Sequence, residues 1–174
     1  METKSFPIKD WTIDVCLLAE NEAKQSYFIV ATSRDRQVGY CSFYFNASEA
    51  TLNRIVVTDS QFLNKGVGQV MLRVMEQFCH EKGIRTIGGY FLPRVYPDAW
   101  DKTSNFYARN GFKGPDGGVD FYDRDEIWKY VNYQGKEFSL QVVFDEELYN
   151  KIYEYNYNIN DLFSSNRKDE SLTL

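Results

Sequence analysis

The chain has 174 residues, which is long enough for one compact domain with a substantial core. Hydrophobic residues make up 43% and charged residues 26%, a balance typical of a folded chain and not of a disordered one. The net charge of −5 is unevenly spread, because residues 1–112 carry 13 basic and 12 acidic side chains and residues 113–174 carry 7 and 13. An acidic half without a basic tract argues against a general nucleic-acid-binding protein, which needs a cationic surface.

Cysteine and histidine are too sparse for a disulfide framework or a zinc site. Cys16, Cys41 and Cys79 are widely spaced, form no C-x-x-C pair and accompany a single histidine. We therefore expect no metal. The segment 1–11 has no apolar signal-peptide core, and no run of about 18 apolar residues occurs anywhere. These features predict a cytoplasmic protein that does not contact membranes.

The first half of the chain reads as strands. Apolar residues alternate from Trp11 to Ala19, which predicts a strand, although Trp11, Val15 and Leu18 also share a helical face and leave a helix open. The β-rich runs 27–32 and 38–45 flank a short polar segment and predict a hairpin. A third β-rich run covers residues 50–57.

The hydrophobic period then changes from two to about 3.6. An amphipathic helix is predicted by the apolar positions Val67, Val70, Met71, Val74, Met75 and Phe78. Lys82 followed by Gly83 is a typical helix end. Residues 84–92 read as a strand, and a right-handed crossover would make it parallel to the strand 50–57.

The remaining elements are a short helix, two strands and a further helix. Asp98 and Asp101 are candidate caps for a helix that ends at Asn110 and Gly111. Strands are predicted within 126–132 and 137–144, a helix within 145–157 and a frayed tail within 164–174.

The fold class is thus α/β (α+β), with a mixed, mostly antiparallel central sheet flanked by helices. Residues 1–144 would form the domain, and 145–174 would be an acidic helix and tail packed on it or extending from it.

The junction before the long helix is the strongest chemical signal. Leu63 to Gln69 reads L-N-K-G-V-G-Q, with two glycines that let the backbone approach a ligand closely. The first helical amides would face outward at the positive end of the helix dipole, which suits a pyrophosphate. No Gly-Lys-Ser/Thr follows and a third glycine is missing, so neither a P-loop nor a Rossmann fingerprint fits. An ordinary tight turn is the alternative.

In this order of elements, the sequence resembles the GNAT superfamily of acyl-CoA-dependent N-acetyltransferases over about residues 26–112. The runs 26–31 and 37–40 look like the family's second and third strands, and Arg54-Ile55-Val56-Val57 looks like its fourth. Asn64-Lys65-Gly66-Val67-Gly68 looks like the second half of its pyrophosphate loop. Asn105 to Phe112 matches the family's short helix ending in Phe-Tyr-x-x-x-Gly-Phe.

The resemblance implies acetyl-CoA as co-substrate. Backbone groups of Val56, Val57 and Thr58 would hold the pantetheine arm. The other implied cofactor-binding residues are Leu63, Asn64, Lys65, Gly66, Val67, Gly68 and Gln69 around the pyrophosphate, with Ser104 and Tyr107 on the short helix. Leu63 departs from the Arg or Gln usual there, and the family's two N-terminal helices have no room between Ala19 and Ser26.

Tyr107 is the residue that the resemblance implies as general acid. A phenol can protonate the thiolate that leaves during thioester aminolysis, although a tyrosine packed in the core is the alternative. Glu49 is the candidate base, with Asp59 as a second possibility and solvated surface carboxylates as the alternative reading. His80 lies about 14 residues beyond Gly66, roughly 20 Å along the helix, so neither it nor Cys79 is expected to act.

The sequence therefore predicts an enzyme that transfers an acetyl group from acetyl-CoA directly to a primary amine, expected to be a small cationic one. Two alternatives stay open: an acetyltransferase acting on protein lysines or N-termini, and an inert CoA-binding or interaction protein on the same fold. Tyr96 and Trp100, in the loop before the short helix, are candidates for the acceptor pocket. A homodimer is left open.

Overall fold

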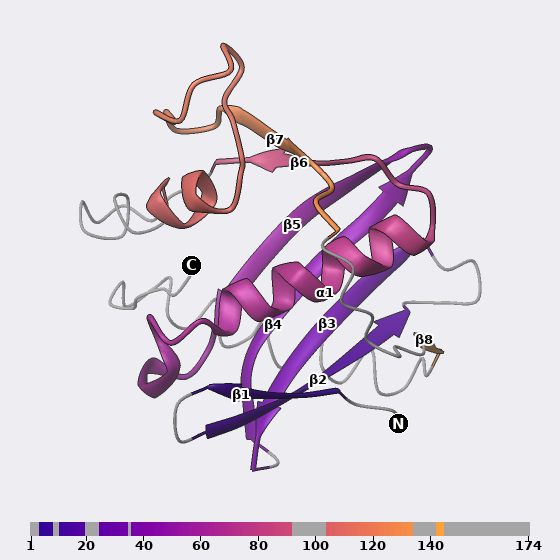
Figure 1. Cartoon of the computed structure of the whole chain (residues 1–174), viewed down its shortest axis with the longest axis vertical. Helices are drawn as coiled ribbons and strands as arrows, with labels where there is room; N and C mark the ends of the chain where they lie inside the picture. Colours follow the sequence, from indigo (N-terminus) through magenta and orange to yellow (C-terminus); the bar gives the residue numbers. More distant parts are fainter. Residues whose placement is uncertain are drawn as a thin grey trace.

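The computed structural model describes residues 4–8, 11–19, 25–34, 36–91, 104–133 and 142–144. These residues form one eight-stranded sheet with the helix α1 (Val67–Glu81) lying across one face, as Figure 1 shows. Along the sheet the strands follow the chain order from β1 to β7, and β8 pairs with β2. No helix within the described ranges is long and apolar enough to cross a membrane.

The first five strands form an antiparallel meander. They are β1 (Lys4–Ile8), β2 (Trp11–Ala19), β3 (Ser26–Ser33), β4 (Arg36–Asn46) and β5 (Glu49–Val57). The segment 11–19 is thus a strand, which resolves the strand-or-helix ambiguity in favour of the two-residue period. β1 was not predicted, because it is short and contains Pro7; a proline in a strand is tolerated at the edge of a sheet, where β1 lies.

The second half of the sheet confirms the predicted parallel pair. β6 (Thr86–Tyr90) runs parallel to β5, and β7 (Glu126–Tyr130) runs antiparallel to β6. Residues 104–109 are helical and carry Tyr107. β8 (Val142–Phe144) covers only the end of the strand predicted over 137–144, and the predicted helix 145–157 and the tail 164–174 lie outside the described residues.

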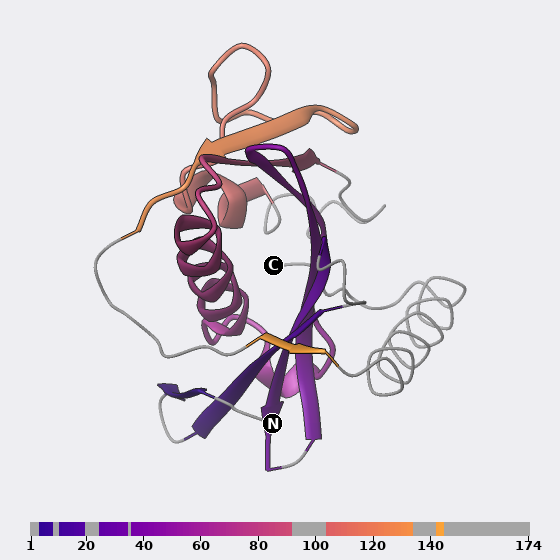
Figure 2. The ribbon, with the colours of Figure 1, turned by 90° about the vertical axis from the view of Figure 1, so that its right-hand side faces the viewer.

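The core fills the space between the sheet and α1. The predicted apolar stripe of α1 is buried as a whole. At the end of the helix, Phe78 packs edge-on against Tyr27 with ring centroids 4.9 Å apart and stacks on Phe45 at 5.4 Å. Figure 2 shows α1 and the helical segment 104–109 on the same side of the curved sheet. Both elements therefore contribute side chains to the same hydrophobic core.

Candidate active site

The chain passes from β5 to α1 through a tight junction. A 3₁₀ turn, η1 (Ser60–Phe62), is capped by Asp59, whose carboxylate accepts a hydrogen bond of 3.0 Å from the amide of Gln61. The backbone then adopts positive φ at Asn64 (60°) and at Gly66 (91°). Asparagine and glycine are the residues that tolerate this region best. The two left-handed residues turn the chain sharply into α1.

The N-terminus of α1 has no side-chain cap. Gly66 is the N-cap and supplies no side-chain hydrogen bond, and the first intrahelical bond runs from the Val70 amide to the Gly66 carbonyl at 3.0 Å. A Cβ added at Gly66 would meet no atom of the described residues within 4 Å. The amides of Val67, Gly68 and Gln69 thus stand at the positive end of a 15-residue helix without a capping side chain. This arrangement fits a pyrophosphate.

A glycine in β4 allows α1 to start close to the sheet. A Cβ at Gly39 would lie 2.9 Å from the Val56 carbonyl oxygen and 3.4 Å from Val67 Cγ1. Any side chain at this position would push apart the end of β5 and the first turn of α1. Gly39 therefore holds the two elements of the candidate cofactor site at close range.

β5 and β6 separate before β5 reaches this junction. Their parallel ladder pairs Glu49 with Thr86 and ends where Thr51 pairs with Gly88, while β5 continues to Val57 along β4. The register with β4 jumps from Leu52 to Arg54, so Asn53 is an extra residue in a β-bulge. A bulge bends its strand and increases its twist, which favours the divergence.

Val57 is the residue whose backbone faces the diverging edge. The amide of Thr58 donates a 2.9 Å hydrogen bond to the Val38 carbonyl of β4. Successive backbone amides point to opposite sides of a strand, so the amide of Val57 points away from β4, toward the side of β6. The hydroxyl of Thr58 is buried and has no hydrogen-bond partner among the residues that the structure describes. Of the backbone groups predicted to hold the pantetheine arm, the Thr58 amide is thus bonded to β4, and Thr58 can contribute its hydroxyl.

Tyr107 is held in an aromatic cage on the α1 side of the sheet. Its ring packs edge-on against Phe106 at 5.4 Å, Phe112 at 5.1 Å and Phe91 at 6.3 Å between centroids, and it is 6% exposed. Burial raises the pKa of Tyr107 above its ordinary value, and the nearby Cys41 thiol group raises it further. The phenol therefore stays protonated well into the alkaline range, the state that a proton donor requires.

With this geometry in view, the sequence was compared with known proteins. The profile of the acetyltransferase (GNAT) domain matches residues 24–114, just over half of the chain. The chain belongs to the GNAT acetyltransferase family. This match confirms the resemblance seen in the sequence and the expected class of enzyme domain, an acyltransferase. A search of curated protein sequences found no match.

Solved GNAT structures share the fold. The PaiA N-acetyltransferase from Thermoplasma acidophilum, solved with coenzyme A, is 22% identical with a TM-score of 0.51; the match covers 62% of this chain and 62% of that one, less than two thirds of its length. A GNAT-family acetyltransferase from Staphylococcus aureus is 18% identical with a TM-score of 0.52, over 65% and 72% of the two chains. A nourseothricin acetyltransferase is 18% identical with a TM-score of 0.51, over 63% and 68%.

Relative to this GNAT frame, Glu49 lies at the start of β5 and on the face opposite α1. Its neighbours Ala50 and Leu52 belong to the core beneath α1, so alternation places Glu49 on the other face. Its carboxylate lies directly over Gly88, where a Cβ would be only 2.7 Å from Oε1. Glu49 thus lies at the paired end of β5, eight residues before Val57, and on the face of the sheet opposite Tyr107.

Asp59, His80 and Cys79 each contact neighbouring residues of the fold. Asp59 caps η1 and forms an ion pair with Arg36, so both of its oxygens are engaged. His80 lies in the last turn of α1, the end remote from Gly66, and stacks on Tyr133 with ring centroids 4.3 Å apart. Burial, followed by the charge of Glu76, raises the pKa of Cys79 to about 12. This arrangement agrees with the expectation that His80 and Cys79 do not act chemically.

Two further sets of predicted residues can be placed. Ser104 is half-buried at the start of the described helical segment, three residues before Tyr107, and Leu63 packs partly buried against the core beneath the loop. Only residues 20–25 connect β2 to β3, so the two N-terminal GNAT helices do not lie between them. Tyr96 and Trp100 lie outside the described residues.

Sequence reasoning missed a buried ion pair next to this GNAT site. Lys129 Nζ and Glu76 Oε1 are 2.6 Å apart, with side chains only 6% and 9% exposed. One signal was present in the sequence: alternation in the strand Glu126–Tyr130 places Lys129 on the same face as the buried Ile127.

Proposed function

We propose that this GNAT chain transfers an acetyl group from acetyl-CoA to a primary amine, and that the acceptor is a small cationic amine. The observation that carries the proposal is the open start of α1 beside the diverging ends of β5 and β6. An anion site formed by helix amides and an exposed strand edge are the two features that a pyrophosphate and an amide-bearing arm need.

In this proposal, the cofactor lies along the junction. The loop residues from Leu63 to Gln69, with Asn64, Lys65 and Gly66 at their centre, hold the pyrophosphate. The backbone of Val57, together with Val56 and the hydroxyl of Thr58, pairs with the pantetheine arm. The Val57 amide also holds the carbonyl oxygen of the thioester, where negative charge develops during attack. Ser104 and Tyr107 meet the arm from the helical segment.

Tyr107 donates a proton to the departing thiolate of CoA, and the attacking amine loses its proton to water. Glu49, the predicted base, lies eight residues before Val57 on β5, about 26 Å along an extended strand, and so is far from an amine at the thioester. Burial raises the pKa of Tyr107, so the phenol carries its proton at neutral pH, the form that can donate one. The result is one amide and one free thiol, with no covalent enzyme intermediate.

A cationic acceptor is supported by charge. Residues 113–174 carry 13 acidic and 7 basic side chains, so the excess negative charge of the chain belongs to this part. An excess of negative charge favours encounter with cationic substrates over anionic ones. The nourseothricin acetyltransferase among the similar structures is named for a small molecule, which agrees with an acceptor of this size.

The proposal is tested by amine-dependent release of CoA from acetyl-CoA, with Tyr107→Phe as the informative variant. We expect kcat to fall about a hundredfold while the Kd for acetyl-CoA is unchanged, because only the proton donor is lost. Tyr122→Phe is the matched control, since the Tyr122 side chain is 71% exposed. An unchanged kcat in Tyr107→Phe would remove the acid role. Release with peptides alone would shift the acceptor to a protein lysine or N-terminus.

A further inference from the structure

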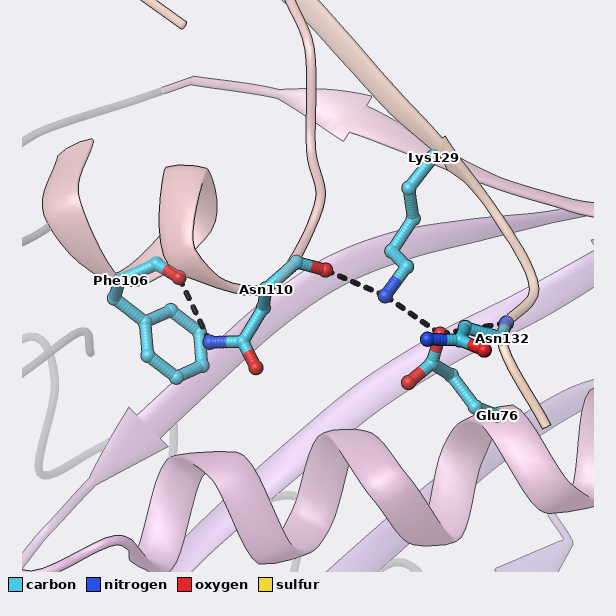
Figure 3. Close-up of polar contacts among 5 residues, drawn as sticks. All are labelled: Glu76, Phe106, Asn110, Lys129 and Asn132. Atoms are coloured by element: carbon cyan, nitrogen blue, oxygen red, sulfur yellow. Dashed lines mark hydrogen bonds and ion pairs between the residues drawn. The ribbon is translucent and has the colours of Figure 1, made fainter. Parts of the chain in front are cut away.

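The helical segment that carries Tyr107 is joined to α1 by a buried, charged contact. Lys129 on β7 reaches inward between the two elements, and Figure 3 shows its ammonium group between Glu76 of α1 and the end of the segment. Its Nζ lies 2.6 Å from Glu76 Oε1 and donates a 2.5 Å hydrogen bond to the carbonyl oxygen of Asn110. Both charged side chains are more than nine-tenths buried.

The contact at Asn110 fixes the end of the helical segment. The amide of Asn110 donates to the carbonyls of Phe106 and Tyr107, both at 3.2 Å, and its side-chain Nδ2 donates to Phe106 at 2.8 Å. A cation at the C-terminus of a helix also interacts favourably with the helix dipole. A shift of the Asn110 carbonyl would therefore also shift the backbone of Tyr107, to which the Asn110 amide is bonded.

Lys129 is also connected to Tyr107 through the aromatic ring of Phe112. Lys129 Nζ lies 5.7 Å from the centroid of Phe112, within the range of a cation–π contact. Phe112 packs edge-on against Tyr107 at 5.1 Å, and its amide donates to the Tyr107 carbonyl at 3.0 Å. Lys129 thus contacts neighbours of Tyr107 on both the backbone and the side-chain side.

The other end of the contact belongs to the helix that begins the cofactor site. Glu76 lies on α1, which starts at Gly66, and its Oε1 also accepts a 3.0 Å hydrogen bond from the Asn132 amide just beyond β7. With two donors on one oxygen, the carboxylate is held in place, and Lys129 with it. Through Lys129, this pair links α1 to the end of the helical segment.

We infer that Lys129 and Glu76 are positioning residues: they hold the Tyr107 phenol at a fixed place relative to the start of α1. The inference rests on the proposed function, because Tyr107 must act on a thiolate delivered by a cofactor bound at α1. A buried pair that served stability alone would be replaceable by neutral groups, since such replacements are often neutral or stabilising. A positioning pair would not be, because small displacements of a reacting group reduce rates strongly.

Two variants separate these roles. Lys129→Met alone leaves the Glu76 carboxylate buried and unpaired, and we expect a marked fall in Tm. Glu76→Gln combined with Lys129→Met removes both charges and keeps an acceptor for the Asn132 amide, so Tm should recover in part. Asn110 still lacks its donor in the double variant. We therefore expect kcat to stay about ten- to a hundredfold below wild type, with the KM for acetyl-CoA nearly unchanged.

The control for lost stability is Phe78→Leu, which loosens α1 on the aromatic side of the core, away from the helical segment. At equal Tm loss it should keep kcat within about twofold of wild type. If kcat of the double variant returns together with its Tm, or if Phe78→Leu loses as much activity, the pair is structural only and the inference is wrong.

A readout without turnover distinguishes this inference from the proposed function. Amide hydrogen exchange at Asn110 and Phe112 should be faster in the double variant than in Phe78→Leu of matched Tm, and exchange at the start of α1 should not differ. Equal exchange at Asn110 and Phe112 would overturn the inference even if acetyl transfer is found. Faster exchange at Asn110 and Phe112 in the double variant, combined with no acetyl transfer by the wild type, would support the link between the ion pair and the Tyr107 segment and refute the proposed acetyltransferase function.

Discussion

Two glycines at opposite ends of α1 provide a matched test of the cofactor site. Gly66 precedes the helix with φ of 91° and Gly83 follows it with φ of 74°, and a Cβ at either position would meet no atom within 4 Å in the part of the chain that the structure describes. Replacing either by alanine creates no clash and forces an L residue into the left-handed region. That strain costs roughly 1–2 kcal/mol. For a chain of this size, each kcal/mol lowers Tm by about 2–4 °C.

The two variants should differ only in binding. Gly66→Ala adds a methyl group at the N-cap of α1, beside the first helical amides, where the pyrophosphate is proposed to lie. Loss of one hydrogen bond to a charged group removes about 1.5–3 kcal/mol, which corresponds to a roughly ten- to 150-fold weaker Kd for acetyl-CoA. Gly83→Ala should bind acetyl-CoA as the wild type does, because Gly83 lies beyond the far end of the helix.

Thermal melting of the free proteins and calorimetric titration with acetyl-CoA measure both quantities. The reasoning is refuted if the two variants bind acetyl-CoA equally well, or if Gly66→Ala binds as tightly as wild type. A difference in Tm between the free variants of much more than a few degrees would contradict the account of strain.

Three further outcomes are expected. Gly39→Ala should lose about 1–3 kcal/mol of stability in chemical denaturation and also weaken acetyl-CoA binding, because its Cβ would lie 2.9 Å from the Val56 carbonyl oxygen. Burial raises the pKa of the Cys41 and Cys79 thiols above 9.0. The contribution of the two neutral thiols to the stability of the fold is therefore complete below pH 9 and is lost as the pH rises further. The free energy of unfolding should fall by about 3 kcal/mol by pH 10, and by about half of that in Cys79→Ala. Because the pKa of Tyr107 is also raised, kcat/KM should show no descending limb below pH 10, which a pH–rate profile would reveal.

The order of the elements could be predicted because hydrophobic period is a local property. Alternation predicted the strand from Trp11 to Ala19, and the 3.6-residue period predicted α1 to within a few residues of its ends. The loop from Leu63 to Gln69 could be predicted equally well, because its two glycines stand directly at the start of the helical pattern in the sequence. Tyr107 was found only through a motif, because one tyrosine among thirteen has no distinguishing local pattern.

The features missed depend on contacts between distant segments. The bulge at Asn53 exists only relative to the register of β4, which no local pattern contains. Beyond the alternation in β7, nothing in the local sequence singles out Lys129, because lysine is rarely buried unless it is paired, and its partner Glu76 is 53 positions away. The bond between the Thr58 amide and the Val38 carbonyl likewise depends on strand pairing, which no local pattern contains.

The most direct test of the account is to follow the acetyl group itself. The protein is incubated with isotopically labelled acetyl-CoA and an equimolar mixture of small cationic amines, lysine peptides and peptides with free N-termini, and all products are analysed by mass spectrometry. The account predicts label on the primary amino group of a small cationic amine, and a strongly reduced yield with Tyr107→Phe. Tight binding of acetyl-CoA without label on any amine would contradict it and leave an inert CoA-binding protein on the GNAT fold.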